Sequence, residues 1–221
     1  MRELVYTETR DLQGFRKKYD VFRFYFWWWF NHLYARIWFG LDIEGEEYIP
    51  KKGRGILVSN HLSFLDANII SAASPRKVSF MIAKEYYEMR AIKWMCEFLG
   101  CIPVNRSGED IAAIKGAIKK LNRDFLIGAF PEGGISRSGE MEDPKEGIAL
   151  IALRTEAPII PVLLSGYRYQ SMFETFLLPK KVSIKIGPPL EFPDVDPKNR
   201  ESLAEVTQAI AKSIQELRDK G

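Results

Sequence analysis

The sequence of 221 residues is poor in the residue types that build metal, redox or disulfide sites. Its two cysteines, Cys96 and Cys101, are too few for a disulfide framework and form no CxxC zinc or redox pair. Two histidines, His32 and His61, exclude a histidine-rich cluster, so we expect no metal. The net charge of +3 is too small to indicate a nucleic-acid partner, and none is expected. The chain is 46% hydrophobic, which is enough for a core that needs no cross-links.

The aromatic N-terminal segment has no apolar run long enough to cross a bilayer. Its uninterrupted run is Phe24–Phe30, whereas a spanning helix needs about 20 mostly apolar residues. It also lacks the small-residue cleavage site of a signal peptide. We therefore expect neither a transmembrane helix nor a secretory leader.

The same segment has the composition of a membrane-docking helix. Residues 1–40 carry seven basic side chains against four acids, which is the whole positive excess of the chain. Trp27, Trp28 and Trp29 stand consecutively, and tryptophan favours the bilayer interface. Basic residues beside such aromatics would meet anionic head groups. We predict that residues 1–40 dock on membrane lipids; the alternative is a helix whose aromatics pack on the domain.

The remaining residues, 41–221, alternate strand and helix signals. This alternation predicts one α/β domain with a mostly parallel central sheet and helices on both faces. Ligands of such sheets bind beyond the carboxyl ends of the strands. The expected strands are 55–59, 78–82, 125–130, 159–164 and 182–186, and the expected helices are 109–121, 147–155 and 199–219.

A histidine and an aspartate follow the first of these strands. His61 and Asp66 would lie about 140° apart on one continuous helix and so would not share a face. Ser63 with Asp66 resembles a capping box, so a helix could begin at Phe64 and His61 could fold back over its first turn. Asp66 would then fix the tautomer of His61 and leave its other nitrogen as a base. A structural histidine is an equally weighted alternative.

A second polar segment, Phe130 to Gly139, follows the 125–130 strand. Its proline, glycines and serines cannot continue as regular structure. Backbone amides such as that of Gly133, together with Arg137, could hold a phosphate. Taken alone, the segment is also compatible with an ordinary strand-to-helix turn.

Taken in order, these stretches resemble the glycerolipid acyltransferase family, in particular bacterial 1-acylglycerol-3-phosphate acyltransferases. The resemblance rests first on HxxxxD at His61–Asp66 and on FPEG about seventy residues later. Gly100–Arg106, Ala157–Val162 and the Ala-Lys pair ending at Lys84 also match, so that residues 40–190 are covered.

The resemblance implies transfer of a fatty acyl group from acyl-CoA or acyl-carrier protein to the sn-2 hydroxyl of 1-acylglycerol-3-phosphate, which makes phosphatidic acid for phospholipid synthesis. No cofactor is implied beyond this co-substrate. His61 would be the general base, oriented by Asp66, and amides near Ser63 are our candidates for stabilising the oxyanion. We expect the enzyme on the cytoplasmic face of the cell membrane, as a peripheral or monotopic protein. The candidate phosphate-binding residues are Lys84, Arg106, Glu132, Gly133 and Arg137.

One departure from the family pattern concerns the acceptor. The family usually continues FPEG with Thr and Arg, where this sequence has Gly134 and Ile135. Either Arg137 replaces the missing ligand or the acceptor is another lysophospholipid. The rival functions are a thioesterase using the same His61 and Asp66, and a non-catalytic membrane-binding module. A nucleophilic hydrolase is disfavoured because the chain has no GxSxG elbow.

Overall fold

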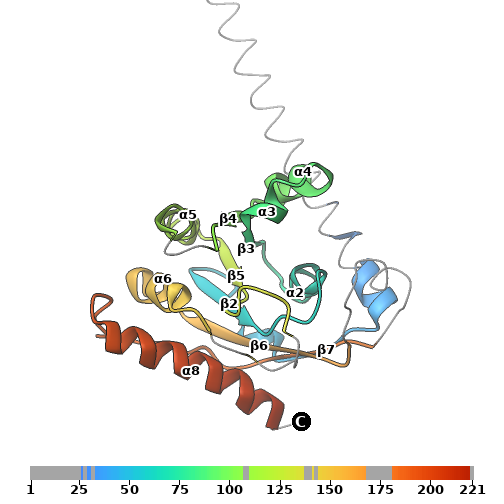
Figure 1. Cartoon of the computed structure of the whole chain (residues 1–221). Coiled ribbons are helices and arrows are strands. Elements are labelled where there is room, and N and C mark those ends of the chain that lie inside the picture. The colour runs from blue at the N-terminus through green and yellow to red at the C-terminus, as the bar shows by residue number, and fades with distance from the viewer. Residues whose placement is uncertain are drawn as a thin grey trace, which may run out of the picture.

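The computed structural model describes residues 26, 29–30, 33–106, 110–136, 141, 144–167 and 181–219. They form a seven-stranded sheet flanked by helices (Figure 1), which confirms the predicted α/β class. The strands are β1 (Asp42–Glu44), β2 (Gly55–Ser59), β3 (Val78–Ala83), β4 (Ile102–Val104), β5 (Leu126–Ala129), β6 (Ile159–Ser165) and β7 (Ser183–Ile186). The helices are η1 (Glu46–Tyr48), α2 (Asp66–Ala73), α3 (Lys84–Tyr87), α4 (Arg90–Leu99), α5 (Ile111–Leu121), α6 (Gly147–Thr155) and α8 (Arg200–Asp219), and residues 33–39 are also helical.

The sheet is mostly parallel, as predicted. Its strand order is β1-β7-β6-β2-β5-β3-β4, and the five strands from β6 to β4 all run parallel. Strand β7 pairs antiparallel with β6, and β1 pairs parallel with β7, so these two strands run the opposite way. The carboxyl ends of the five parallel strands therefore lie at one edge of the sheet, which we call the active edge.

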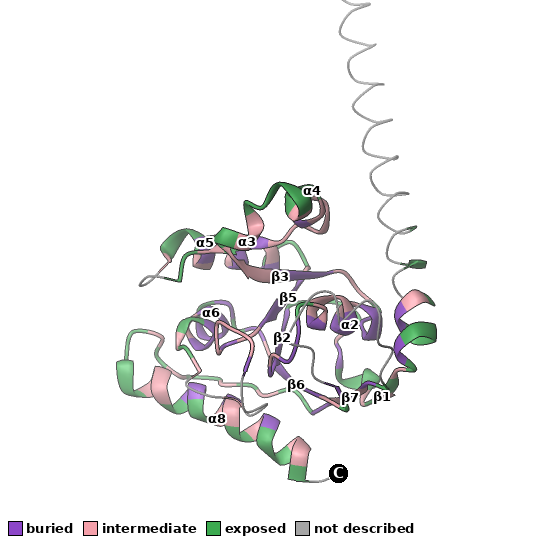
Figure 2. Ribbon diagram, turned by 45° about the vertical axis from the view of Figure 1, so that its right-hand side comes forward, coloured by how far each residue is buried: buried purple, intermediate pink, exposed green. Residues whose placement is uncertain are grey.

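Helices cover both faces of the sheet, and each face has its own core. Every residue of β2 is buried, and Leu57 points to one core while Ile56 and Val58 point to the other. Helix α2 and residues 33–39 pack on the first face, and α5, α6 and α8 pack on the second. Figure 2 shows the buried residues concentrated along the strands and on the sheet-facing sides of these helices. The long apolar rows of β2 and β6 follow from this double coverage.

The helix boundaries show which local signals were sufficient. Helix α6 covers the expected residues 147–155, whereas α5 begins at Ile111, because Asp110 is the N-cap and accepts a hydrogen bond from the amide of Ala113 at 2.9 Å. The expected start at residue 109 lies outside the described residues. Helices α3 and α4, which connect β3 to β4, were not predicted.

Only part of the predicted membrane-docking segment can be compared with the structure. Ala35 and Phe39 are buried in the core of the first face, so this helix packs on the domain. Trp29 is 58% exposed and Ile37 is 74% exposed, so other side chains of the segment face outward. Trp27 and Trp28 lie outside the described residues. Among the helices that are described, none has the length and apolarity needed to cross a membrane.

Candidate active site

The side chains singled out in the sequence gather at the active edge. His61 follows β2, Lys84 begins the helix after β3, and Arg106 follows β4. Phe130, the first residue of the FPEG motif, follows β5, and Tyr167 follows β6. The parallel arrangement of these strands thus brings residues that are up to 106 positions apart in the sequence to the same edge.

Where the chain turns away from the sheet after β2, the amide and the carbonyl of Leu164 in β6 still have hydrogen-bond partners. The side-chain nitrogen of Asn60 donates to the carbonyl oxygen of Leu164 at 3.0 Å, and its side-chain oxygen accepts from the amide of Leu164 at 2.9 Å. Asn60 is 1% exposed. Its side chain therefore takes the place of a peptide group in the pairing of β2 with β6 and fixes the chain immediately before His61.

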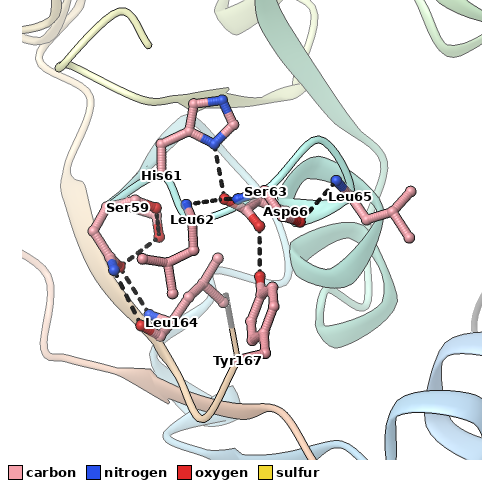
Figure 3. A network of polar contacts seen from close by, with 9 residues as sticks. Ser59, His61, Leu62, Ser63, Leu65, Asp66, Leu164 and Tyr167 are labelled. Atoms are coloured by element: carbon pink, nitrogen blue, oxygen red, sulfur yellow. Dashed lines mark hydrogen bonds and ion pairs between the residues drawn. The ribbon is translucent and has the colours of Figure 1, made fainter. Parts of the chain in front are cut away.

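His61 and Asp66 form the predicted pair. The Nδ1 atom of His61 lies 2.8 Å from Oδ2 of Asp66. Since a carboxylate only accepts hydrogen bonds, this contact places the ring hydrogen on Nδ1 and the lone pair of the neutral ring on Nε2. The His61 side chain is 19% exposed, and Figure 3 shows its second nitrogen directed away from Asp66. The histidine thus presents a base to the outside of the fold.

Asp66 is completely buried but fully supplied with donors. Its Oδ2 atom also accepts from the amides of Leu62 at 2.6 Å and Ser63 at 2.9 Å. Its Oδ1 atom accepts from the hydroxyl of Tyr167 at 2.5 Å (Figure 3). Hydrogen bonds to the ionised form offset the cost of burying a carboxylate. Asp66 is therefore held in one orientation by groups from two separate parts of the chain.

The start of α2 differs from the prediction, and Ser63 bonds within the turn that precedes the helix. Helix α2 begins at Asp66 instead of Phe64, and the Ser63 hydroxyl accepts from the amide of Leu65 at 3.1 Å. The Ser63 amide donates to Asp66, as in the second half of a capping box. The amides of Leu62 and Ser63 are thus bonded to Asp66, and the oxyanion role suggested for amides near Ser63 stays a prediction.

Aromatic rings fix the plane of the His61 imidazole. The rings of His61 and Phe130 are stacked with centroids 4.2 Å apart and planes inclined by 12°. Phe130 stacks in turn on Phe80, at 5.8 Å between centroids. Phe80 fits against β5 because Gly128 has no side chain: a Cβ there would lie 2.4 Å from the Phe80 ring. A glycine in the strand therefore helps to set the position of the histidine.

The FPEG loop is attached directly to the histidine. The amide of Ser136 donates to the carbonyl oxygen of His61 at 2.8 Å. Gly133 adopts a positive φ of 69°, and its amide donates to the carbonyl oxygen of Phe130 at 3.1 Å. A Cβ at Gly133 would lie 3.2 Å from Nζ of Lys145, so the Lys145 side chain lies against this turn. Glu132 is half-buried in the same turn, and Arg137 lies outside the described residues.

Lys84 and Arg106 occupy the active edge farther from the histidine along the sheet. Lys84 Nζ lies 3.8 Å from Oε1 of Glu88, and Arg106 Nε lies 3.2 Å from Oε1 of Glu85. The guanidinium of Arg106 also lies 5.5 Å from the ring centroid of Tyr86. Both cations are exposed and keep an acidic neighbour, so a bound phosphate would compete with these carboxylates for them.

Sequence reasoning missed three residues of this site: Phe130 as a packing partner, Tyr167 and Lys145. Phe130 was visible in the FPEG motif, but nothing in the sequence shows that its ring faces His61. Tyr167 comes two residues after β6, and a polar residue just beyond a parallel strand was the available signal. Lys145 has no local signal because only the turn at Gly133 brings it to the loop.

The structure gives no other centre of comparable chemistry among the residues it describes. No group of three or more His, Cys, Asp or Glu side chains in this part of the chain could hold a metal ion. Cys96 is buried, and its hydrogen bond with Cys101 lowers the pKa of Cys96 and raises that of Cys101, which burial raises further. Cys96 lies in α4, and Cys101 lies between α4 and β4, directly before the start of that strand.

Comparison with known proteins assigns the family. The Acyltransferase family model matches residues 40–165, which include both motifs. The chain is 26% identical over 180 residues to the mouse 1-acyl-sn-glycerol-3-phosphate acyltransferase alpha, covering 78% of this chain and 63% of that protein. It is also 26% identical over 148 residues to the chloroplastic 1-acyl-sn-glycerol-3-phosphate acyltransferase BAT2 of Brassica napus, covering 62% of this chain and 43% of the relative. The chain belongs to the acyltransferase family.

A solved structure shares the fold. The crystal structure of the 1-acyl-sn-glycerophosphate acyltransferase PlsC from Thermotoga maritima superposes with a TM-score of 0.65, covering 92% of this chain and 89% of that one, at 22% sequence identity. This confirms the α/β architecture. The chain spans 43% and 63% of the lengths of the two curated relatives above.

Proposed function

We propose that this protein transfers a fatty acyl group from a thioester donor, acyl-CoA or acyl-carrier protein, to the sn-2 hydroxyl of 1-acylglycerol-3-phosphate. The observation that carries the proposal is the contact of 2.8 Å between His61 and a buried Asp66, made beside the FPEG loop at the active edge. The matched family and its relatives support acyl transfer as the reaction class. The product would be phosphatidic acid.

In the proposed mechanism His61 acts as a general base and then as a general acid. Nε2 takes the proton of the acceptor hydroxyl while its oxygen attacks the thioester carbonyl carbon. The tetrahedral intermediate collapses with cleavage of the C–S bond, and the imidazolium returns its proton to the leaving thiolate. Asp66 holds the ring through Nδ1 and stabilises the positive charge that develops on it. No acyl-enzyme is formed in this scheme.

Basic residues at the active edge would bind the phosphate of the acceptor. Lys145 lies against Gly133 in the loop that is bonded to His61, and we place it beside Lys84 and Arg106 in this role. Arg137 and the turn containing Glu132 and Gly133 remain candidates from the sequence. This chain lacks the Thr-Arg pair that the family usually has in this loop, and Lys145 supplies a positive charge there.

Acyl transfer to several lysolipids, read by mass spectrometry with both donor types, tests the proposal. His61→Ala should reduce transfer by about 10²–10⁴-fold with unchanged vesicle binding and folding. Lys145→Gln should raise the KM for 1-acylglycerol-3-phosphate, whereas Lys145→Arg should restore it because the positive charge returns. Full activity of His61→Ala would refute the mechanism, and free fatty acid as the main product in the presence of acceptor would indicate a thioesterase.

A different lysophospholipid acceptor is the second candidate, since Gly134 and Ile135 replace the residues expected after FPEG. Gly134 has open space where a side chain would stand, so a larger head group could approach the loop here. The same acceptor panel decides between the two. A kcat/KM that is higher for a lysolipid with a larger head group, and insensitive to Lys145→Gln, would favour this second acceptor.

The N-terminal segment would hold the enzyme on the membrane that contains its lipid substrate, on the cytoplasmic face. Trp29, Ile37 and Trp38 are exposed on the described part of this helix, and acidic residues there should release the protein from anionic vesicles. Trp29→Glu combined with replacement of Trp27 and Trp28 is the direct test, by vesicle sedimentation. Unchanged sedimentation would return the segment to a purely core-packing role.

A further inference from the structure

The active edge carries exposed apolar side chains that the acyl-transfer reaction does not use. Phe64 is 42% exposed, Met89 46%, Trp94 56% and Ile111 60%. They come from the segments that follow β2, β3 and β4, the same strands that deliver His61, Lys84 and Arg106. We call these four residues the rim. All four stand in connections that leave the sheet at the active edge.

Contacts through Tyr86 join the segments that carry Phe64 and Met89. The ring of Phe64 meets that of Tyr86 edge-on, with centroids 5.8 Å apart. The amide of Met89 donates to the carbonyl oxygen of Tyr86 at 3.1 Å, and Arg106 lies over the Tyr86 ring. Tyr86 in α3 therefore connects the histidine loop to α4 and to the end of β4.

Helix α4 supplies the larger part of this surface because its apolar side is only partly covered. Cys96 is its one buried residue, and neither of the two core clusters formed by the described residues includes a residue of α4. Figure 2 shows α4 at the outside of the molecule. The indole nitrogen of Trp94 donates to the carbonyl oxygen of Ala91 within the helix, at 3.0 Å. Its ring can therefore enter an apolar environment without losing a hydrogen bond.

Charge selects the occupant of the surface. Arg90 and Lys93 are exposed on α4, and no acidic side chain in the described ranges lies within ion-pair distance of either. They stand next to Met89 and Trp94 in the sequence, and Glu88, the acid on the other side of Met89, lies 3.8 Å from Nζ of Lys84. A combination of positive charge and apolar side chains suits an anionic bilayer surface, where rings enter the interface and ammonium groups meet the head groups.

We propose that the rim, together with Arg90 and Lys93, is a second membrane-contact surface that turns the exposed side of His61 toward anionic lipid. It is separate from the N-terminal segment, and its functional sense rests on the acyl-transfer activity proposed above. Docking through this edge would let a lipid acceptor reach His61 from the bilayer while its acyl chain remains there.

The test compares full-length variants by sedimentation with vesicles of phosphatidylcholine alone or mixed with phosphatidylglycerol. Trp94→Glu and Met89→Glu should each weaken partitioning to the mixed vesicles by about tenfold, since each removes apolar contact and adds repulsion. Arg90→Gln and Lys93→Gln should each weaken it about fivefold on mixed vesicles and little on phosphatidylcholine alone. Tyr48→Glu is the matched control, because Tyr48 is 39% exposed in η1, beyond β1, which ends at the opposite edge of the sheet.

An activity measurement separates this proposal from the proposed function. With a short-chain, water-soluble lysolipid, Trp94→Glu should keep the wild-type rate, and with a vesicle-embedded acceptor it should lose about tenfold. Absence of acyl transfer in the wild type would refute the proposed function. The sedimentation result would then decide by itself whether the rim contacts the membrane. Wild-type sedimentation of both Trp94→Glu and Met89→Glu would overturn the rim proposal. So would unchanged sedimentation with a raised KM for acyl-carrier protein, which would assign the surface to the donor protein.

Discussion

The hydroxyl of Tyr167 donates to Oδ1 of Asp66 at 2.5 Å, on the side of the carboxylate that His61 does not use. Tyr167 follows β6 and Asp66 begins α2, so this bond joins two elements that are 101 residues apart. Both groups are buried. The orientation of the proposed catalytic pair therefore depends on a residue that follows a strand outside the HxxxxD motif.

Tyr167→Phe should lower kcat about tenfold without changing the KM for the acceptor. The variant removes a hydrogen bond to a charged group, which is worth about 1.5–3 kcal/mol, but it keeps the ring that fills the site. Steady-state kinetics with thermal unfolding in parallel measures both effects. A rise in KM with constant kcat would contradict an orienting role, because Tyr167 would then act on substrate binding.

Gly128→Ala should reduce both stability and activity. Gly128 lies in β5 and does not contact His61 itself, but it packs against Phe80, which is connected to His61 through Phe130. The new Cβ would lie 2.4 Å from the Phe80 ring, so this ring must move and disturb the Phe80–Phe130–His61 stack. We expect a loss of about 1–3 kcal/mol in the free energy of unfolding. The double variant with Phe80→Leu should be less destabilised than the sum of the single variants, because a smaller side chain accommodates the Cβ. Additive losses in a double-mutant cycle would show that the two sites are not coupled.

Asn60→Ala should destabilise the fold by about 2–3 kcal/mol in urea unfolding. It leaves both the amide and the carbonyl of Leu164 without their partner in a buried position. Asn60→Asp should be no better, since a carboxylate can accept from the amide but repels the carbonyl oxygen. A stable Asn60→Asp variant would show that the pairing is not needed to hold β6.

Lys77 and Lys120 make the free energy of unfolding depend on pH in the alkaline range. Burial lowers the pKa of both amines, and the positive charge of Lys120 lowers that of Lys77 further. Between the lowered pKa values of the folded state and about 10.5 in the unfolded chain, the unfolded chain binds more protons, so these two groups make stability rise with pH. Below the folded-state pKa values both amines are charged in the folded and the unfolded chain, so the full cost of burying these charges lowers the stability.

Urea unfolding of the wild type and Lys120→Met between pH 8 and 10.5 measures this effect. The lost hydrogen bond from Lys120 to Ser79 gives the variant a different stability at every pH, so the readout is the slope. The wild-type free energy of unfolding should increase more steeply with pH than that of the variant. Parallel curves would mean that Lys120 does not titrate differently on folding.

The sequence was most informative where one local pattern decides the structure. The apolar run at 55–59 became β2 with the same bounds, and the helix at 147–155 became α6, because burial on both faces leaves few other arrangements for such segments. The HxxxxD stretch also predicted the contact of His61 with Asp66, since the fold-back was the one way for these side chains to meet.

Long-range packing set the limits of this prediction. The antiparallel pairing of β7 with β6 depends on where the chain returns to the sheet, and short strands such as β1 and β4 have too few residues to show a period. The bonding of the loop after β2 was not predicted either, because a sequence cannot show that a buried carboxylate will accept from the amides of its own loop. Phe130 and Tyr167 reach the histidine pair only through the order of the strands.

Asn60 has a consequence for where chemistry can occur on this scaffold. By completing the pairing of Leu164, it allows the backbone to diverge from the middle of the sheet instead of from its periphery. His61 and Asp66 consequently follow a strand with neighbours on both sides; the loop after one neighbour brings Phe130 to His61, and the loop after the other brings Tyr167 to Asp66. A reactive group on an outer strand would have such support from one side alone.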